Sequence, residues 1–186
     1  MKKRIFLVAI LLCCLALASG GTLAYFTARQ TAHNVITTGE LDMQLIEKQA
    51  DGTPFPENGI AGVMPGDKIG KIVTVKNIGG VDFYTRIKTT FALFDAEGGT
   101  DKLTAENITL NINAEAWTKQ GNYYYYNRSL APTEETEPLF THVDFGTELD
   151  NDYQKARVEI YVEAEAVQSR NNTDSPLTAA GWDSND

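Results

Sequence analysis

Residue types that commonly perform hydrolytic chemistry are scarce in this chain of 186 residues. His33 and His142 are its 2 histidines, and neither belongs to an H-E-x-x-H pair. A zinc site needs about three protein ligands in fixed geometry and a carboxylate base near the bound water. His33 also lies in the stretch that follows the apolar N-terminal run, where a rigid site is not expected. The sequence therefore predicts no catalytic zinc site.

Nucleophilic catalysis has equally little support. No G-x-S-x-G elbow is present, and the 2 cysteines, Cys13 and Cys14, both lie inside an apolar run. The acidic pairs at 134–135 and 150–152 suit weak calcium binding at most, because no D-x-D-x-D-G loop contains them. We therefore expect no catalytic residue, no metal and no cofactor, and we interpret the acidic pairs as solvated surface.

Charge argues against two further classes of partner. The formal net charge is −9, and residues 2–4 hold three of the 16 basic residues. The rest of the chain therefore carries 13 basic against 25 acidic residues, a net charge near −12. Such a surface repels nucleic acid and anionic headgroups. We expect no nucleic-acid partner, and contact with a membrane only before a signal peptide is removed.

The N-terminal segment, which precedes the predicted strands, is typical of an exported protein. Basic residues 2–4 come before an apolar run at 5–18. Thr22 and Ala24 then supply small residues at −3 and −1 of a cleavage bond before Tyr25. This layout is that of a secretory signal peptide, which is expected to form a helix.

Two alternatives to a cleaved signal remain open. The uncharged stretch at 5–28 is long enough to span a bilayer as an uncleaved anchor. A lipoprotein would need small residues just before its cysteine, whereas residues 11–12 are both leucine, which argues against lipidation. Export is predicted in each case.

From Glu40 onward, apolar and polar residues alternate with the period of a half-buried strand. Loops rich in Pro, Gly and Asn separate these stretches. The tetrapeptide Met-Pro-Gly-Asp at 64–67 predicts a tight turn, with proline second and a glycine of positive φ third. Strands are predicted at residues 41–48, 71–76, 81–94, 108–113, 139–145 and 156–167, with a hairpin at 117–126.

The succession of short strands with almost no helix indicates an all-β protein. We predict a single antiparallel β-sandwich of jelly-roll type preceded by an N-terminal signal helix. The predicted organisation is a signal peptide at 1–25, an N-terminal segment at 26–39, a β-sandwich domain at 40–168 and a polar flexible tail at 169–186.

Four consecutive tyrosines, Tyr123, Tyr124, Tyr125 and Tyr126, form a candidate aromatic contact surface. In a strand, two of the rings lie on each face, so one pair is expected to pack inward. The other pair either covers an exposed strand or stacks on a partner such as a carbohydrate. Both interpretations remain open.

Several motifs resemble the TasA/camelysin family of exported Gram-positive proteins, whose signals are cut by a SipW-type signal peptidase. The string G-G-T-x-A-x-F ends the apolar segment, and G-x-L-D follows a short polar stretch at 39–42. P-G-D-K at 65–68 and V-K-N-x-G at 75–79 extend the likeness. The resemblance implies that the peptidase recognises Gly20, Gly21, Thr22, Leu23, Ala24, Tyr25 and Phe26.

The resemblance also implies a non-enzymatic, secreted protein of the extracellular or biofilm matrix that assembles into fibres. Its partners would be other copies of itself, other matrix proteins and, during export, the signal peptidase. Cleavage would free an N-terminal segment able to complete a neighbour's sheet. The alternatives are a secreted camelysin-like metalloprotease and a monomeric cell-surface binding module. The candidate donor strand includes Phe26, Thr27, Ala28, Val35 and Ile36.

Overall fold

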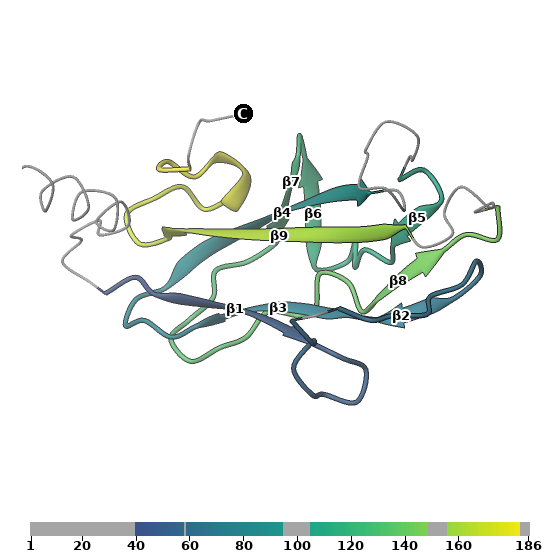
Figure 1. Ribbon diagram of the computed structural model, residues 1–186. Helices are drawn as coiled ribbons and strands as arrows, with labels where there is room; N and C mark the ends of the chain where they lie inside the picture. The colour runs from purple at the N-terminus through teal and green to yellow at the C-terminus, as the bar shows by residue number, and fades with distance from the viewer. Residues whose placement is uncertain (1–39, 58, 95–104, 149–155, 183–186) are drawn as a thin grey trace, which may run out of the picture. The chain divides into compact units, whose positions relative to one another are not determined.

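The computed structural model describes residues 40–57, 59–94, 105–148 and 156–182 (Figure 1). The chain divides into two compact units, Met1–Thr38 and Gly39–Asp186. The first unit lies outside the described residues, and with it the expected signal helix, the signal-peptidase residues 20–26 and the donor segment 26–36. Within the described ranges, no helix has the length and apolar character needed to cross a membrane.

The described residues form strands and a single short 3-10 helix, which confirms the all-β class for this part of the chain. The elements are β1 (Met43–Lys48), β2 (Lys68–Gly70), β3 (Ile72–Asn77), β4 (Phe83–Phe94), β5 (Ile108–Leu110), β6 (Trp117–Gln120), β7 (Tyr123–Tyr126), β8 (His142–Phe145), β9 (Arg157–Gln168) and η2 (Pro176–Thr178).

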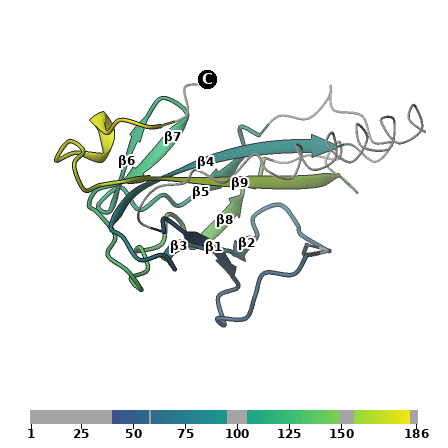
Figure 2. The same cartoon turned by 90° about the vertical axis from the view of Figure 1, so that its left-hand side faces the viewer.

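All strand pairs are antiparallel and belong to sheets of order β1-β3, β2-β8-β5 and β6-β7-β4-β9. The first two sheets continue one another, because Lys71 alone separates β2 from β3. The segment before β8 also bonds to β3: Leu139 N donates to Val73 O at 2.9 Å, and Thr136 N to Val75 O at 2.9 Å. Two layers result, and Figure 2 shows β4 and β9 lying over β1, β2 and β3.

The core fills the space between these layers. The inner strands supply its centre, because alternate residues of a strand point to the same face. Val73 and Val75 of β3 and Phe83 and Ile87 of β4 are fully buried. Trp117 is buried as well, and its Nε1 donates to Glu137 O at 3.0 Å, which satisfies its polar atom.

The turn predicted at 64–67 is confirmed. Asp67 N donates to Met64 O at 3.0 Å, and Met64 N donates to the Asp67 carboxylate at 2.7 Å. Gly66 has a φ of +89°, the left-handed conformation that this position requires.

Some strand boundaries differ from the prediction. The strand predicted at 108–113 ends at Leu110, and the one predicted at 139–145 begins only at His142. Leu139 and Phe140 bond to β3 in an irregular pattern instead. The short strand β2 was not predicted, since three residues give too little alternation to detect. The jelly-roll path of the chain stays a prediction.

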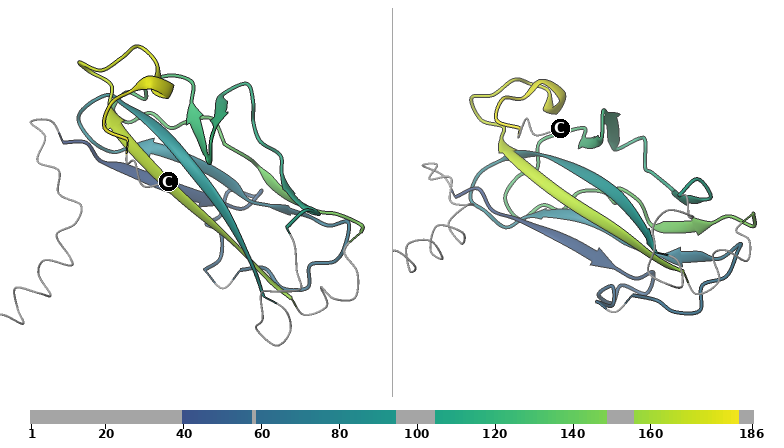
Figure 3. Two further views of the ribbon diagram at one scale, coloured as in Figure 1. Left: turned by 90° about the horizontal axis from the view of Figure 1, so that it is seen from above. Right: turned by 45° about the horizontal axis from the view of Figure 1, so that its top comes forward.

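The segment after β9 packs on the sheet, whereas the sequence suggested a polar flexible tail from residue 169. Figure 3 shows it beside the end of β9 and the start of β4. The Tyr84 hydroxyl donates to Thr173 O at 3.0 Å, and Ala179 and Trp182 pack with Tyr84 and Val167. The sequence did not predict this packing because the few apolar residues that make the contacts lie in a mostly polar stretch. The structure describes this segment to residue 182.

Candidate functional site

One side of the two layers ends in two strands that each have a single partner among the described strands. β9 pairs with β4 over its whole length, from Phe83↔Gln168 to Phe94↔Arg157. β1 pairs with β3 on one side, and its end is bridged at Lys48↔Pro54 on the other. Figures 1 and 3 place β1 and β9 on the same side of the layers. We call this side the β1/β9 side.

Apolar residues under the β1/β9 side are incompletely covered. Those that pack on the core from the two edge strands are only half-buried, whereas Val75 of β3 and Ile87 of β4 are 0% exposed. Because a free edge also leaves backbone N–H and C=O groups without strand partners, this side suits an added strand. The half-buried residues are Met43, Leu45, Val158, Ile160, Val162, Ala164 and Ala166.

The outward face of β9 is charged. Arg157 pairs with Glu159 at 3.0 Å, and the Tyr161 hydroxyl donates to Glu159. That hydrogen bond and the negative charge of Glu159 raise the pKa of Tyr161 above its ordinary value. Over residues 157–163, β9, an edge strand among the described strands, therefore has one apolar face toward the core and one polar face toward solvent.

The N-terminal segment joins the domain at a tightly held corner. Gly80 N donates to Glu40 O at 2.9 Å, and the Ile78 and Gly79 amides donate to Asp42 O at 3.1 and 3.0 Å. Residues 40 and 42 of the G-x-L-D motif therefore contact the turn that ends the V-K-N-x-G motif. A β-carbon on Gly79 would overlap the Glu40 carbonyl oxygen, which explains the glycine.

Asn77 holds the same corner from the inside. Its side chain is fully buried, donates to Val81 O at 2.8 Å and Leu130 O at 2.9 Å, and accepts from Gly79 N at 2.9 Å. This amide satisfies three backbone groups of two turns at once. The sequence identified this asparagine only as a turn residue.

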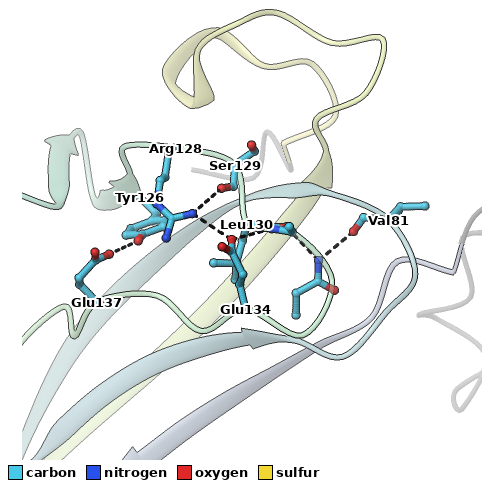
Figure 4. Close-up of polar contacts among 9 residues, drawn as sticks. Val81, Tyr126, Arg128, Ser129, Leu130, Glu134 and Glu137 are labelled. Carbon is cyan, nitrogen blue, oxygen red and sulfur yellow. Dashed lines mark hydrogen bonds and ion pairs between the residues drawn. The ribbon is translucent and has the colours of Figure 1, made fainter.

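The acidic pair at 134–135 is engaged in contacts within the fold. Arg128 bonds to Glu134 at 2.9 Å (Figure 4), and Glu134 also accepts from Ala131 N. The backbone bond and the arginine together hold the pKa of Glu134 below its ordinary value. Glu135 accepts from Thr74 Oγ1 at 2.6 Å. These contacts agree with the interpretation of the pair as surface; residues 150–152 lie outside the described ranges.

The four tyrosines divide between the faces as the alternation predicts. Tyr126 lies in the core at 1% exposure, its hydroxyl bonds to Glu137 (Figure 4), and Tyr124 packs on the core while partly exposed. Tyr123 and Tyr125 lie on the outer face, yet each is only 5% exposed. This burial agrees with a cover on the sheet more closely than with a stacking surface.

Arg86 is the group that the outer tyrosines cover. Its Nε donates to Glu165 at 2.8 Å and its Nη1 to the Tyr125 hydroxyl at 3.0 Å, while the Tyr123 ring lies 3.7 Å from its Cζ. Burial alone lowers the pKa of Arg86, but the bonds to Tyr125 and Glu165 outweigh it and raise that pKa. Trp182 closes the cluster with its ring 4.9 Å from the guanidinium.

His142 is the histidine that the structure describes, since His33 lies outside the described ranges. Its Nε2 lies 3.1 Å from Asp144, which also pairs with Lys68 at 2.7 Å. The Lys68 hydrogen bond, with His142 nearby, lowers the pKa of Asp144. Across the described ranges no three His, Cys, Asp or Glu side chains cluster as metal ligands do. The described residues therefore do not fit a zinc centre.

Two antiparallel layers, in which β1 and β9 are edge strands among the described strands, define an all-β protein. The chain belongs to the camelysin metallo-endopeptidase family, whose model matches residues 1–138. This match covers every motif on which the resemblance rests and confirms it at the level of the family. Among curated proteins, no match is found. The type of signal peptidase stays a prediction.

Proposed function

We propose that this protein is a secreted structural component of an extracellular matrix, biofilm included, whose copies assemble into fibres. The N-terminal segment of one copy would add to the sheet of a neighbour. The observation that carries the proposal is the β1/β9 side, with half-buried apolar residues and two edge strands that each have a single partner among the described strands. The added strand would complete the jelly-roll sandwich that the sequence predicts.

The segment at 26–36 matches this side in length and pattern. It has 11 residues, against 12 in β9. The even positions carry four apolar residues together with Gln30 and Asn34, so a strand formed from the segment would place its more apolar face toward the core. The opposite face is mostly polar, as an outward face requires, with Val35 as the exception. The core-facing apolar residues would be Phe26, Ala28, Ala32 and Ile36.

Export and assembly would be consecutive in this proposal. Cleavage within 20–26 by a SipW-type signal peptidase would release the segment, and the membrane would be a partner only before that step. A neighbour's sheet would then satisfy the segment's backbone groups, as in other cases of strand addition. The partners are copies of the same chain and other matrix proteins, and the location is outside the cell.

Removing residues 26–36 behind the cleavage site tests strand donation. We expect a secreted monomer with an unchanged circular dichroism spectrum and no filaments in electron micrographs. A matched pair refines the test: Ile36→Asp places a charge on the core face and should abolish filaments, whereas Val35→Asp points outward and should not. Filaments of unchanged yield from the deleted chain would contradict the proposal.

The family description specifies a second function, a metallo-endopeptidase. Casein cleavage by the purified protein, with and without a chelator, tests it together with the metal content of the sample. Chelator-sensitive cleavage that copurifies with the protein would favour the enzyme over the structural role. A His142→Ala variant with unchanged cleavage would then place the metal ligands elsewhere in the chain.

A further inference from the structure

We propose that a hollow beside the hairpin of β6 and β7 binds the uronic-acid units of an acidic polysaccharide. This inference goes beyond the proposed function and does not depend on fibre assembly. The carrying observation is the lining of the hollow, which bears two lysines and otherwise uncharged residues although the chain as a whole has a net charge of −9. We call it the hairpin hollow.

The hairpin hollow forms because β4 is longer than the strand beside it. β4 pairs with β7 only as far as Lys88↔Tyr123 and then continues to Phe94 (Figure 1). The step between the hairpin and the rest of β4 leaves a hollow of about 330 Å³ that is partly open to solvent. Pockets for small ligands measure about 300–1,000 Å³, so the hairpin hollow suits about one or two sugar units of a polymer.

Two ammonium groups lie beside aromatic rings at this hollow. Lys119 Nζ lies 5.5 Å from the centroid of the Tyr124 ring, and Lys88 Nζ lies 5.6 Å from that of the Tyr123 ring. Glu163 of β9 is in register with Lys88. Within the described residues, however, neither Lys88 nor Lys119 forms an ion pair. Both charges are therefore available to an anionic ligand.

The uncharged part of the lining suits a sugar ring. Tyr124 is half-buried, so part of its ring can stack on the apolar face of a sugar. The side chains of Thr89, Thr90 and Asn122 can exchange hydrogen bonds with sugar hydroxyls. A sugar that carries a carboxylate offers the negative charge, the hydroxyls and the apolar ring face together, which matches the whole lining.

A second hollow, of about 320 Å³, shows by contrast how polar groups can be used up within the fold. Asn127, Arg128 and Glu137 are part of its lining. Both polar atoms of the Asn127 amide are bonded, Arg128 bonds to Glu134, and Glu137 bonds to the Tyr126 hydroxyl (Figure 4). The two hollows are similar in size, so the charge and the available polar groups favour the hairpin hollow as the ligand site.

The rest of the surface selects against more densely charged polymers. Beyond residues 2–4 the chain carries 13 basic against 25 acidic residues, and this excess of negative charge repels polyanions. Duplex DNA carries one negative charge per about 1.7 Å of helix axis. A polyuronide carries at most one charge per sugar unit, so the repulsion is weaker. An acidic peptide would also be attracted to the two lysines, but it lacks the sugar ring.

Calorimetric titration of the secreted protein with tetragalacturonate at low salt tests the site. We expect saturable binding that weakens about fivefold in Lys88→Gln and in Lys119→Gln, because each substitution removes one charge contact near the surface. Lys76→Gln is the matched control, since Lys76 belongs to β3 and does not line the hollow. It removes the same charge from the protein and should leave the binding constant unchanged.

Two comparison ligands identify what the site recognises. The methyl-esterified tetragalacturonate keeps the sugar rings and loses the charges, and a tetraglutamate peptide keeps the side-chain charges and has no sugar ring. We expect both to bind about tenfold more weakly than tetragalacturonate. Absence of tetragalacturonate binding, or equal losses in all three lysine variants, would overturn the proposal. Equal affinity for either comparison ligand would overturn it as well.

Discussion

Gly79 and Gly80 differ sharply in their surroundings although they are neighbours in one turn. A β-carbon on Gly79 would overlap the Glu40 carbonyl oxygen and lie 2.6 Å from Asp42 N. Nothing lies within 4 Å of the corresponding position on Gly80. The two glycines therefore offer a test of whether close backbone contact at the junction stabilises the domain.

We expect Gly79→Ala to reduce the free energy of unfolding by about 1–3 kcal/mol, because the obstructing atoms belong to the backbone and cannot rotate away. Gly80→Ala should change it by less than about 1 kcal/mol, since its site is open. Urea unfolding of both variants measures the difference. Equal losses from the two substitutions would show that contact with residues 40–42 is not what requires glycine at 79.

At the scale of elements, the sheet β6-β7-β4-β9 is covered on both faces over the part that carries Arg86. The core covers one face, and the outer tyrosines and the C-terminal segment cover the other. Trp182 is the main contact of that segment here, with its ring centroid 5.6 Å from that of Tyr125 and its Nε1 bonded to Pro176 O at 2.9 Å. The segment that follows β9 therefore contributes contacts that stabilise the fold.

Trp182→Ala should lower the free energy of unfolding by about 1–3 kcal/mol, through lost ring contacts with Tyr125 and Arg86. Tyr161→Ala is the matched control, since Tyr161 is an aromatic residue on the outward side of β9 with 51% exposure. It should change stability by about 0.5 kcal/mol or less. Chemical denaturation of both variants is the measurement, and a neutral Trp182→Ala would show that the segment adds nothing to the fold.

At the scale of the whole molecule, the acidic surface makes stability depend on pH. The carboxyls of Asp51, Glu134 and Asp144 all have lowered pKa values in the fold. A carboxyl whose pKa is lowered by folding stabilises the folded state above its unfolded pKa. That contribution is lost as the pH falls through the folded pKa.

The melting temperature of the Asp144→Asn variant should therefore fall less steeply than that of the wild type as the pH drops below 3.8, the ordinary pKa of the aspartyl group. Lys68→Met removes the hydrogen bond that lowers the pKa of Asp144 most, and it should flatten the same part of the curve. Melting temperatures from pH 6 down to about pH 2.5 report the effect. Superimposable curves for wild type and both variants would contradict the role of this cluster.

Much of this architecture could be read from local sequence patterns. Period-two alternation located β1, β3, β4 and β9 to within a few residues, because one buried face imposes that period. Boundaries near Leu139 and Leu110 were missed, since an irregular segment can satisfy its backbone through tertiary bonds. The packing of residues 169–182 was missed for a related reason: a few apolar anchors in a polar stretch give no period.

The sequence by itself determined the all-β class and the family motifs, because these depend on residues close together in the chain. Only the tertiary structure decided which strands are edges and which tyrosines are buried. It also showed that residues 40–42 and the turn after β3 hold one corner. These properties depend on contacts between distant residues, such as Asn77 with Leu130 and Arg86 with Glu165. The local alternation of apolar and polar residues does not predict such contacts.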